Sequence, residues 1–164
     1  MKINTLKKQT EQPKETITVE SRRFGKLRLP GDSQLQMARP LLGFPGLTEF
    51  ALFKEDTQAP LFWLQSLQDP GVAFLLLDPT SVLGYVIDRK ELEGVDLELD
   101  SPKDALVLTT VTLRNPWKES TTNLRAPLLI NTRTRRAAQL VLQDDAYNTK
   151  EPIFSEIKAR GGRT

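Results

Sequence analysis

Histidine and cysteine are both absent from the 164 residues of this chain. Without histidine, the chain lacks the commonest general acid–base group of enzymes and a frequent metal ligand. Without cysteine, it can form neither thiol nucleophiles nor disulfide bonds. Catalysis would have to rely on carboxylates, lysine or serine. We therefore expect a protein that is not an enzyme and that uses no cofactor and no metal.

The chain also lacks a strong charge of one sign and a long hydrophobic run. Lys and Arg number 23 against 21 Asp and Glu, a net charge of +2. This balance does not suggest the concentrated basic face of a nucleic-acid-binding protein. The longest apolar run, residues 72–77, is far shorter than the ~20 residues that cross a bilayer. The N-terminal lysines are not followed by the apolar segment of a signal peptide. We expect a cytoplasmic protein without membrane contact.

The ends of the chain differ from its middle. Residues 1–16 are polar and charged, and the last residues include Gly161 and Gly162. Such segments bury too little surface to offset the entropy of ordering them. We predict a flexible extension over residues 1–16, a single domain over residues 17–155 and a flexible tail over residues 156–164. Basic residues near the N-terminal end, Arg22 and Arg23 among them, would then belong to a solvated tail.

Short strands punctuated by glycine and proline dominate the middle of the chain. Capping signals at Asp88 and Ser101 predict one or two helical turns. Many short strands with little helix favour a sandwich or a barrel. We predict a mainly β fold, a small closed or strongly curved antiparallel β-barrel. The predicted strands are residues 17–21, 50–53, 61–64, 72–77, 85–87, 105–112, 121–124, 128–131 and 139–142.

Two groups of charged residues suggest alternative functions. The carboxylate pairs Asp96 with Glu98 and Asp144 with Asp145 are typical of solvated faces. A hydrolase would need one pair to converge in a deep pocket. The second group is a cluster of three arginines, Arg133, Arg135 and Arg136. Aromatic residues are not interleaved with these arginines, as they would be in an RNA-binding platform. A β-barrel RNA-binding module that uses this cluster stays open as an alternative function.

A polar segment with one central leucine follows the strand predicted at residues 61–64. A loop that presents a leucine within a polar rim suits contact with another protein, although an ordinary connection is the simpler alternative. The residues that we predict as a partner-binding loop are Gln65, Ser66, Leu67, Gln68, Asp69 and Pro70.

Two asparagines, Asn123 and Asn131, frame an apolar run that Pro127 interrupts. Proline cannot donate to a sheet ladder, so it marks an edge strand or a bend. The asparagine amides can tie such a bend through hydrogen bonds to the backbone. We assign the three residues to architecture.

This asparagine block resembles a motif of the FliW family, the flagellar assembly factors of bacteria, and other blocks agree with it in order. They are a Gly-Phe loop at residues 43–44, an L-Q-S-hydrophobic block at 64–67, an S-P-x-D block at 101–104 and a final stretch at 139–147. The similarity covers roughly residues 17–153. Gln68 stands where the family usually carries an acidic residue. The motif residues that we expect to be structural are Gly43, Phe44, Asn123, Pro127, Asn131 and Gln139.

The resemblance implies a non-catalytic β-barrel protein with two competing partners, flagellin and the RNA-binding translational repressor CsrA. Flagellin that accumulates in the cytoplasm would occupy the factor. After flagellin is exported, the freed factor would bind CsrA and relieve the repression of flagellin mRNA translation, which is linkage through a shared component. The resemblance thus implies a flagellin chaperone and CsrA antagonist with no direct nucleic-acid contact. We expect a monomer.

Overall fold

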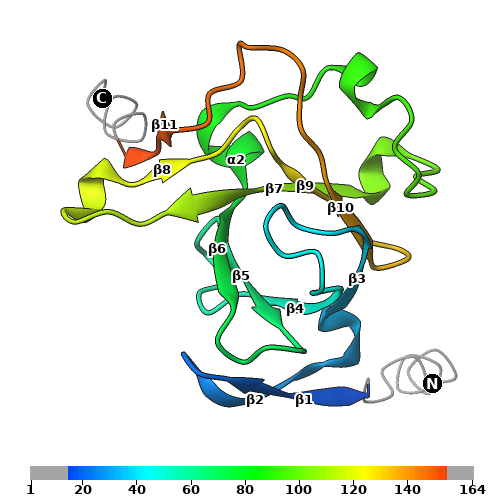
Figure 1. The fold of residues 1–164 in the computed structure, drawn as a ribbon, viewed down its shortest axis with the longest axis vertical. Coiled ribbons are helices and arrows are strands. Elements are labelled where there is room, and N and C mark those ends of the chain that lie inside the picture. The colour runs from blue at the N-terminus through cyan, green and yellow to red at the C-terminus, as the bar shows by residue number, and fades with distance from the viewer. Residues whose placement is uncertain (1–14, 155–164) are drawn as a thin grey trace, which may run out of the picture.

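The computed structural model describes residues 15–154 and is mainly β (Figure 1). The short α-helix α2 spans Pro79–Leu83, and 3-10 turns span Gly31–Ser33, Arg89–Leu92, Pro102–Asp104 and Trp117–Glu119. The strands are β1 (Thr16–Ser21), β2 (Gly25–Pro30), β3 (Gln34–Arg39), β4 (Glu49–Phe53), β5 (Leu61–Ser66), β6 (Ala73–Leu77), β7 (Ala105–Thr112), β8 (Thr121–Thr122), β9 (Leu128–Asn131), β10 (Arg136–Gln139) and β11 (Glu151–Pro152). None of the helices among these residues is long and apolar enough to cross a membrane.

Seven strands close into a barrel in the order β7-β6-β5-β4-β3-β10-β9, and β9 pairs back with β7. The predicted closed β-barrel is confirmed. The expectation of a wholly antiparallel barrel is wrong in one place, because β10 pairs with β3 in parallel. An odd number of strands in a closed ring cannot alternate direction throughout, so at least one neighbouring pair has to be parallel.

The barrel interior holds the main core, which includes Leu35, Phe50, Leu64 and Leu108. Strand β9 shows why some strands lack a polar face. Alternate residues of a strand point to opposite sides, so its Leu128 and Ile130 enter the barrel core while Leu129 joins a second cluster on the outside. The chain between α2 and β7 forms the cover over Leu129 (Figure 1).

The hairpin of β1 and β2 forms a separate two-stranded sheet below the barrel (Figure 1). Its tip docks through Phe24, whose ring lies 5.4 Å from that of Phe53 and 5.2 Å from that of Trp63. The placement of Arg22 and Arg23 in a solvated tail is therefore wrong, because the docked aromatic holds both against the barrel. The extension and tail predicted over residues 1–16 and 156–164 lie almost wholly outside the described residues and stay predictions, although β1 already begins at Thr16.

Most predicted strands are present, and the differences have local causes. Residues 85–87 are not a strand, because their backbone is bonded to side chains, such as the Tyr147 hydroxyl, and not to the backbone of a neighbouring strand. The strand predicted at 121–124 ends at Thr122, and the one predicted at 139–142 lies earlier, as β10. The patterns did not predict β2, β3 or α2. The capped turns after Asp88 and Ser101 are confirmed, as 3-10 turns.

Candidate functional site

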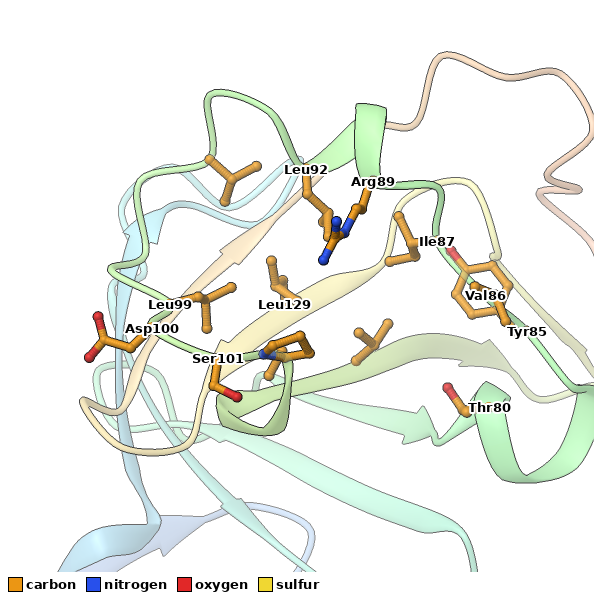
Figure 2. Close-up of a pocket in the computed structure, with 14 residues that line it drawn as sticks. Thr80, Tyr85, Val86, Ile87, Arg89, Leu92, Leu99, Asp100, Ser101 and Leu129 are labelled. Carbon is orange, nitrogen blue, oxygen red and sulfur yellow. The ribbon is translucent and has the colours of Figure 1, made fainter.

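An open groove of about 680 Å³ runs along the outside of the barrel, between β7 and β9 on one side and residues 85–102 on the other (Figure 2). We call residues 85–102 the wall. In Figure 2, Ile87, Leu92 and Leu99 extend from the wall toward Leu129 of β9. The lining is mainly apolar and comprises Thr80, Tyr85, Val86, Ile87, Arg89, Leu92, Val95, Leu99, Asp100, Ser101, Pro102, Ala105, Val107 and Leu129.

Two tyrosines fasten the first part of the wall. The Tyr85 hydroxyl donates to the Leu124 carbonyl at 2.7 Å, and the Tyr147 hydroxyl donates to the Val86 carbonyl at 3.2 Å. The two rings meet edge to face at 5.7 Å. Burial, followed by the nearby Tyr147 and Glu91, raises the pKa of the Tyr85 hydroxyl above its ordinary value of 10. The hydroxyl therefore stays protonated and remains a donor throughout the neutral range.

Asn131 fastens the far part of the wall and is fully buried. Its Nδ2 donates to the carbonyls of Leu97 at 2.7 Å and Glu98 at 3.3 Å, while its Oδ1 accepts from the backbone N–H groups of Arg133 and Thr134. Glu98 has a φ of +52°, a conformation that costs a non-glycine residue about 1–2 kcal/mol. The Asn131 amide thus holds a strained turn of the wall against the end of β9.

Further bonds hold the middle of the wall. The Glu91 carboxylate accepts from the backbone N–H groups of Gln143 and Asp144 at 3.0–3.1 Å. The Arg39 guanidinium at the end of β3 donates to the Gly94 carbonyl at 3.2 Å. The wall has little regular structure, so its position is fixed by side-chain bonds to other segments, at residues 39, 124, 131–133 and 143–147.

The groove can bind an apolar chain but offers no acid–base set. Neither predicted carboxylate pair lines it, and all four of those acidic side chains are exposed. Within residues 15–154, no group of three His, Cys, Asp or Glu residues could hold a metal ion. Val86, which is 75% exposed, adds an apolar side chain to the open mouth. Exposed apolar surface of this kind is typical of sites that bind other proteins.

The predicted partner-binding loop is only partly a loop. Gln65 and Ser66 are fully buried residues of β5, so the expectation that they are exposed in a loop is wrong. The Gln65 Nε2 donates to carbonyls of Ser66, Pro70 and Val72, and the Ser66 Oγ accepts from the N–H groups of Gln68 and Asp69. These two polar side chains hold the following turn together from inside.

The remaining predicted loop residues are more accessible. Leu67 is half-buried, and Gln68, Asp69 and Pro70 are exposed. The Gln68 Oε1 accepts from the N–H groups of Thr48 at 2.7 Å and Glu49 at 3.0 Å. A carboxylate in its place could accept the same bonds. A role for this turn in partner binding stays a prediction.

A small cavity of about 360 Å³ adjoins this turn, and sequence reasoning missed it. Arg22, Arg23, Trp63, Pro70, Gly71 and Ala73 line it. The Arg23 guanidinium lies 4.5 Å from the centre of the Trp63 indole ring. The tip of the β1–β2 hairpin forms one side, and nothing in the local pattern of residues 21–25 indicates that docking.

The motif residues make contacts that hold the architecture. Gly43 has a φ of +86°, which favours glycine, and the Phe44 ring packs against Phe74 at 5.1 Å. The Gln139 side chain accepts from Leu42 N–H and donates to the Ala126 carbonyl, joining two segments. The Asn123 Oδ1 accepts from two N–H groups of the bend that leads into the buried Pro127.

The arginine cluster is largely paired. Arg133 lies 2.8 Å from the Asp100 carboxylate and 3.8 Å from that of Asp104, and Arg135 lies 3.7 Å from Asp32. Paired guanidinium groups are less available to phosphates, so the arrangement disfavours the alternative of an RNA-binding surface.

Sequence reasoning also missed the groove itself. One signal was available, because Val95, Leu97 and Leu99 alternate with Asp96 and Glu98 as in a half-buried strand. In the structure Leu97 is buried, Val95 and Leu99 line the groove, and the acidic residues between them are exposed. The alternation therefore indicated a segment whose apolar residues cover the outside of the barrel, although the segment does not pair with the sheet.

Comparison with known proteins gives consistent matches. The family model described as FliW protein matches residues 18–153. Flagellar assembly factor FliW of Treponema denticola is 32% identical over 146 residues, covering 88% of this chain and 99% of that protein. FliW of Syntrophotalea carbinolica is 34% identical over 132 residues, covering 80% and 94%. A crystal structure of the flagellar assembly factor FliW matches with a TM-score of 0.73 and 26% identity, covering 84% of this chain and 97% of that chain.

Proposed function

Because the chain belongs to the FliW family of flagellar assembly factors, we propose that it binds flagellin and the translational repressor CsrA in alternation, without a catalytic step. Flagellin bound to the factor keeps CsrA free to repress flagellin mRNA. Once flagellin is exported from the cytoplasm, the factor binds CsrA and relieves that repression.

The apolar groove is the observation that carries this proposal. It provides aliphatic side chains on both sides and stays open to the surface. Filling such a groove with apolar side chains removes apolar area from water, at roughly 25 cal/mol per Å². We propose the groove as a protein-docking site, and the exposed turn at Gln68, Asp69 and Pro70 as a second contact on the same molecule.

Mass action alone can account for the proposed alternation between flagellin and CsrA. When one component is shared, the concentration of free factor sets how much CsrA is inhibited, and flagellin sets the concentration of free factor. A groove that both partners need would make their binding mutually exclusive. Two separate surfaces would require an energetic coupling between sites, typically 1–3 kcal/mol.

Calorimetric titration of the full chain with flagellin, and separately with CsrA, from the same organism tests the proposal. We expect binding to both partners, and loss of CsrA binding when flagellin is bound first. Binding to neither would refute the proposed partners and leave the family and the fold unchanged.

A pair of matched variants tests the groove. Val86→Asp places a charge at the groove mouth, and Val141→Asp places the same charge at an apolar side chain that is 50% exposed and outside the groove. We expect Val86→Asp to weaken at least one partner about tenfold or more, because burying a valine contributes about 1.5–3 kcal/mol. Equal affinities for the two variants and the original chain would remove the groove from the proposal.

A further inference from the structure

Among residues 15–154, Arg89 is the groove-lining charged residue without an ion-pair partner. Two groove-lining residues carry a charge at neutral pH, Arg89 and Asp100. Asp100 already pairs with Arg133 at 2.8 Å. Among residues 15–154, no carboxylate lies within ion-pair distance of the Arg89 guanidinium. Figure 2 shows the Arg89 side chain extending from the wall over the groove toward Leu129.

The position of Arg89 is fixed by local structure. It begins the 3-10 turn Arg89–Leu92, and the Asp88 carboxylate caps that turn by accepting from the Lys90 N–H. The Glu91 carboxylate of the same turn is bound to Gln143 and Asp144, which anchors the turn to the next segment. A guanidinium on an anchored turn loses less side-chain freedom when it binds than one on a free loop would.

We propose that the groove binds an aliphatic segment of a protein partner that carries one acidic side chain, and that Arg89 recognises this acid. The inference rests on the proposed function, because it names the chemistry of the segment that the groove accepts. Apolar side chains that fill the groove displace water from its apolar lining, which is favourable. The acid would lie at the rim, where Arg89 is exposed and the desolvation penalty is small.

The surrounding charges limit the partner segment to a single acid. Glu93, Asp96 and Glu98 are exposed on the wall. These like charges would repel a run of acidic residues within the ~8–10 Å over which salt leaves charges unscreened. A carboxylate beside Arg89 gains a charge-assisted hydrogen bond, whereas an acid elsewhere along the wall gains none. Arg89 therefore acts as a specificity determinant within a mainly apolar site.

Selection from a displayed library of random 12-residue peptides tests the inference without assuming the identity of the partner. The full chain, Arg89→Gln, Lys90→Gln and Val86→Asp would be used as separate targets. Lys90→Gln is the matched control, because it removes a positive charge from an exposed neighbour on the same turn that does not line the groove. We expect peptides rich in aliphatic residues with one Asp or Glu from the original chain and from Lys90→Gln. We expect no acidic preference from Arg89→Gln.

Calorimetry on the most enriched peptide completes the test. Replacing its acid with the matching amide should weaken binding to the original chain and to Lys90→Gln about two- to fivefold, because an exposed ion pair contributes up to about 1 kcal/mol. The same replacement should leave the affinity for Arg89→Gln unchanged. Failure to enrich any peptide, enrichment that Val86→Asp does not abolish, or an equal acidic preference in all targets would overturn the inference. Titration with flagellin and CsrA is independent of these outcomes, so failure of the proposed partners would be recognised separately.

Discussion

The barrel and the wall beside it are held by different kinds of interaction. In the barrel, each strand is bonded to two neighbours, and fully buried leucines and Phe50 fill the interior. The wall has no ladder. Side-chain bonds from Asn131, Tyr147, Arg39 and Glu91 hold it against the outside of the same strands.

This contrast suggests that the barrel mainly determines the stability of the protein, whereas the wall serves the binding of partners. Hydrophobic burial in the barrel contributes to global stability and tolerates little change in shape. We expect the wall to open locally more readily than the barrel, because a few side-chain bonds hold each part of it. A groove between a rigid and a less rigid side is suited to a protein that exchanges partners.

The largest effect is expected in the barrel interior. Phe50 lies on β4, the strand between β3 and β5, and its ring is fully buried in the barrel core. Phe50→Ala removes this ring and leaves a cavity. We expect the free energy of unfolding to fall by about 3–5 kcal/mol, measured by denaturant titration. A loss below about 1 kcal/mol would contradict the view that the barrel core determines stability.

A smaller effect is expected where the wall joins the barrel. Asn131→Ala removes four hydrogen bonds and leaves the Leu97 carbonyl of the wall without its donor, while the Glu98 carbonyl keeps its bond from the Arg133 guanidinium. We expect a loss of about 1–3 kcal/mol and faster hydrogen exchange in residues 95–99. Asn123→Ala, the control, removes two acceptor bonds of the bend at residues 125–126 and should not change exchange in the wall. Equal exchange in both variants would refute the anchoring role of Asn131.

Tyr85→Phe should have a modest effect that depends on pH. Loss of the hydrogen bond to the Leu124 carbonyl should lower the free energy of unfolding by about 1 kcal/mol at pH 7. The pKa of Tyr85 is raised in the folded protein, so the unfolded chain releases this proton first as pH rises. The original chain should therefore lose stability progressively above about pH 10, and Tyr85→Phe should lose less over that range. Parallel stability curves for the two proteins in alkaline solution would contradict this account.

The smallest effect on stability is expected at the groove mouth. The Val86 side chain is mostly exposed, so Val86→Asp should change the free energy of unfolding by no more than about 0.5 kcal/mol, as should Val141→Asp. Thermal unfolding of both variants checks this. A clear destabilisation by Val86→Asp alone would mean that Val86 supports the wall instead of forming a docking surface.

The sequence predicted most of the barrel because its strands carry their own signals. Residues 105–112 and 128–131 are apolar or β-branched and lie between turn residues, and both are strands. β10 was misplaced because its buried pair, Ala137 and Ala138, is small and gives little hydrophobic pattern. The parallel pairing of β10 with β3 joins strands about a hundred residues apart, and no local pattern contains that information.

The candidate site was less predictable for a physical reason. The wall is fixed by long-range bonds from residues such as Asn131 and Tyr147 to backbone carbonyls that any sequence would provide. The partner-binding loop was predicted from a polar composition, but Gln65 and Ser66 are buried, and the backbone of the following turn bonds to the Gln65 Nε2 and the Ser66 Oγ. The Gln65 Oε1 has no hydrogen-bond partner among the described residues. Composition cannot distinguish a polar side chain that forms hydrogen bonds with water from one that forms them with backbone groups.

Hydrogen exchange of the full chain, with and without bound flagellin and CsrA, tests the central claim most directly. The account predicts slower exchange in the wall, residues 85–102, when a partner is bound, with smaller changes in the β1–β2 hairpin. Protection confined to residues 67–71, or to any surface away from the wall, would contradict the assignment of the groove as the docking site.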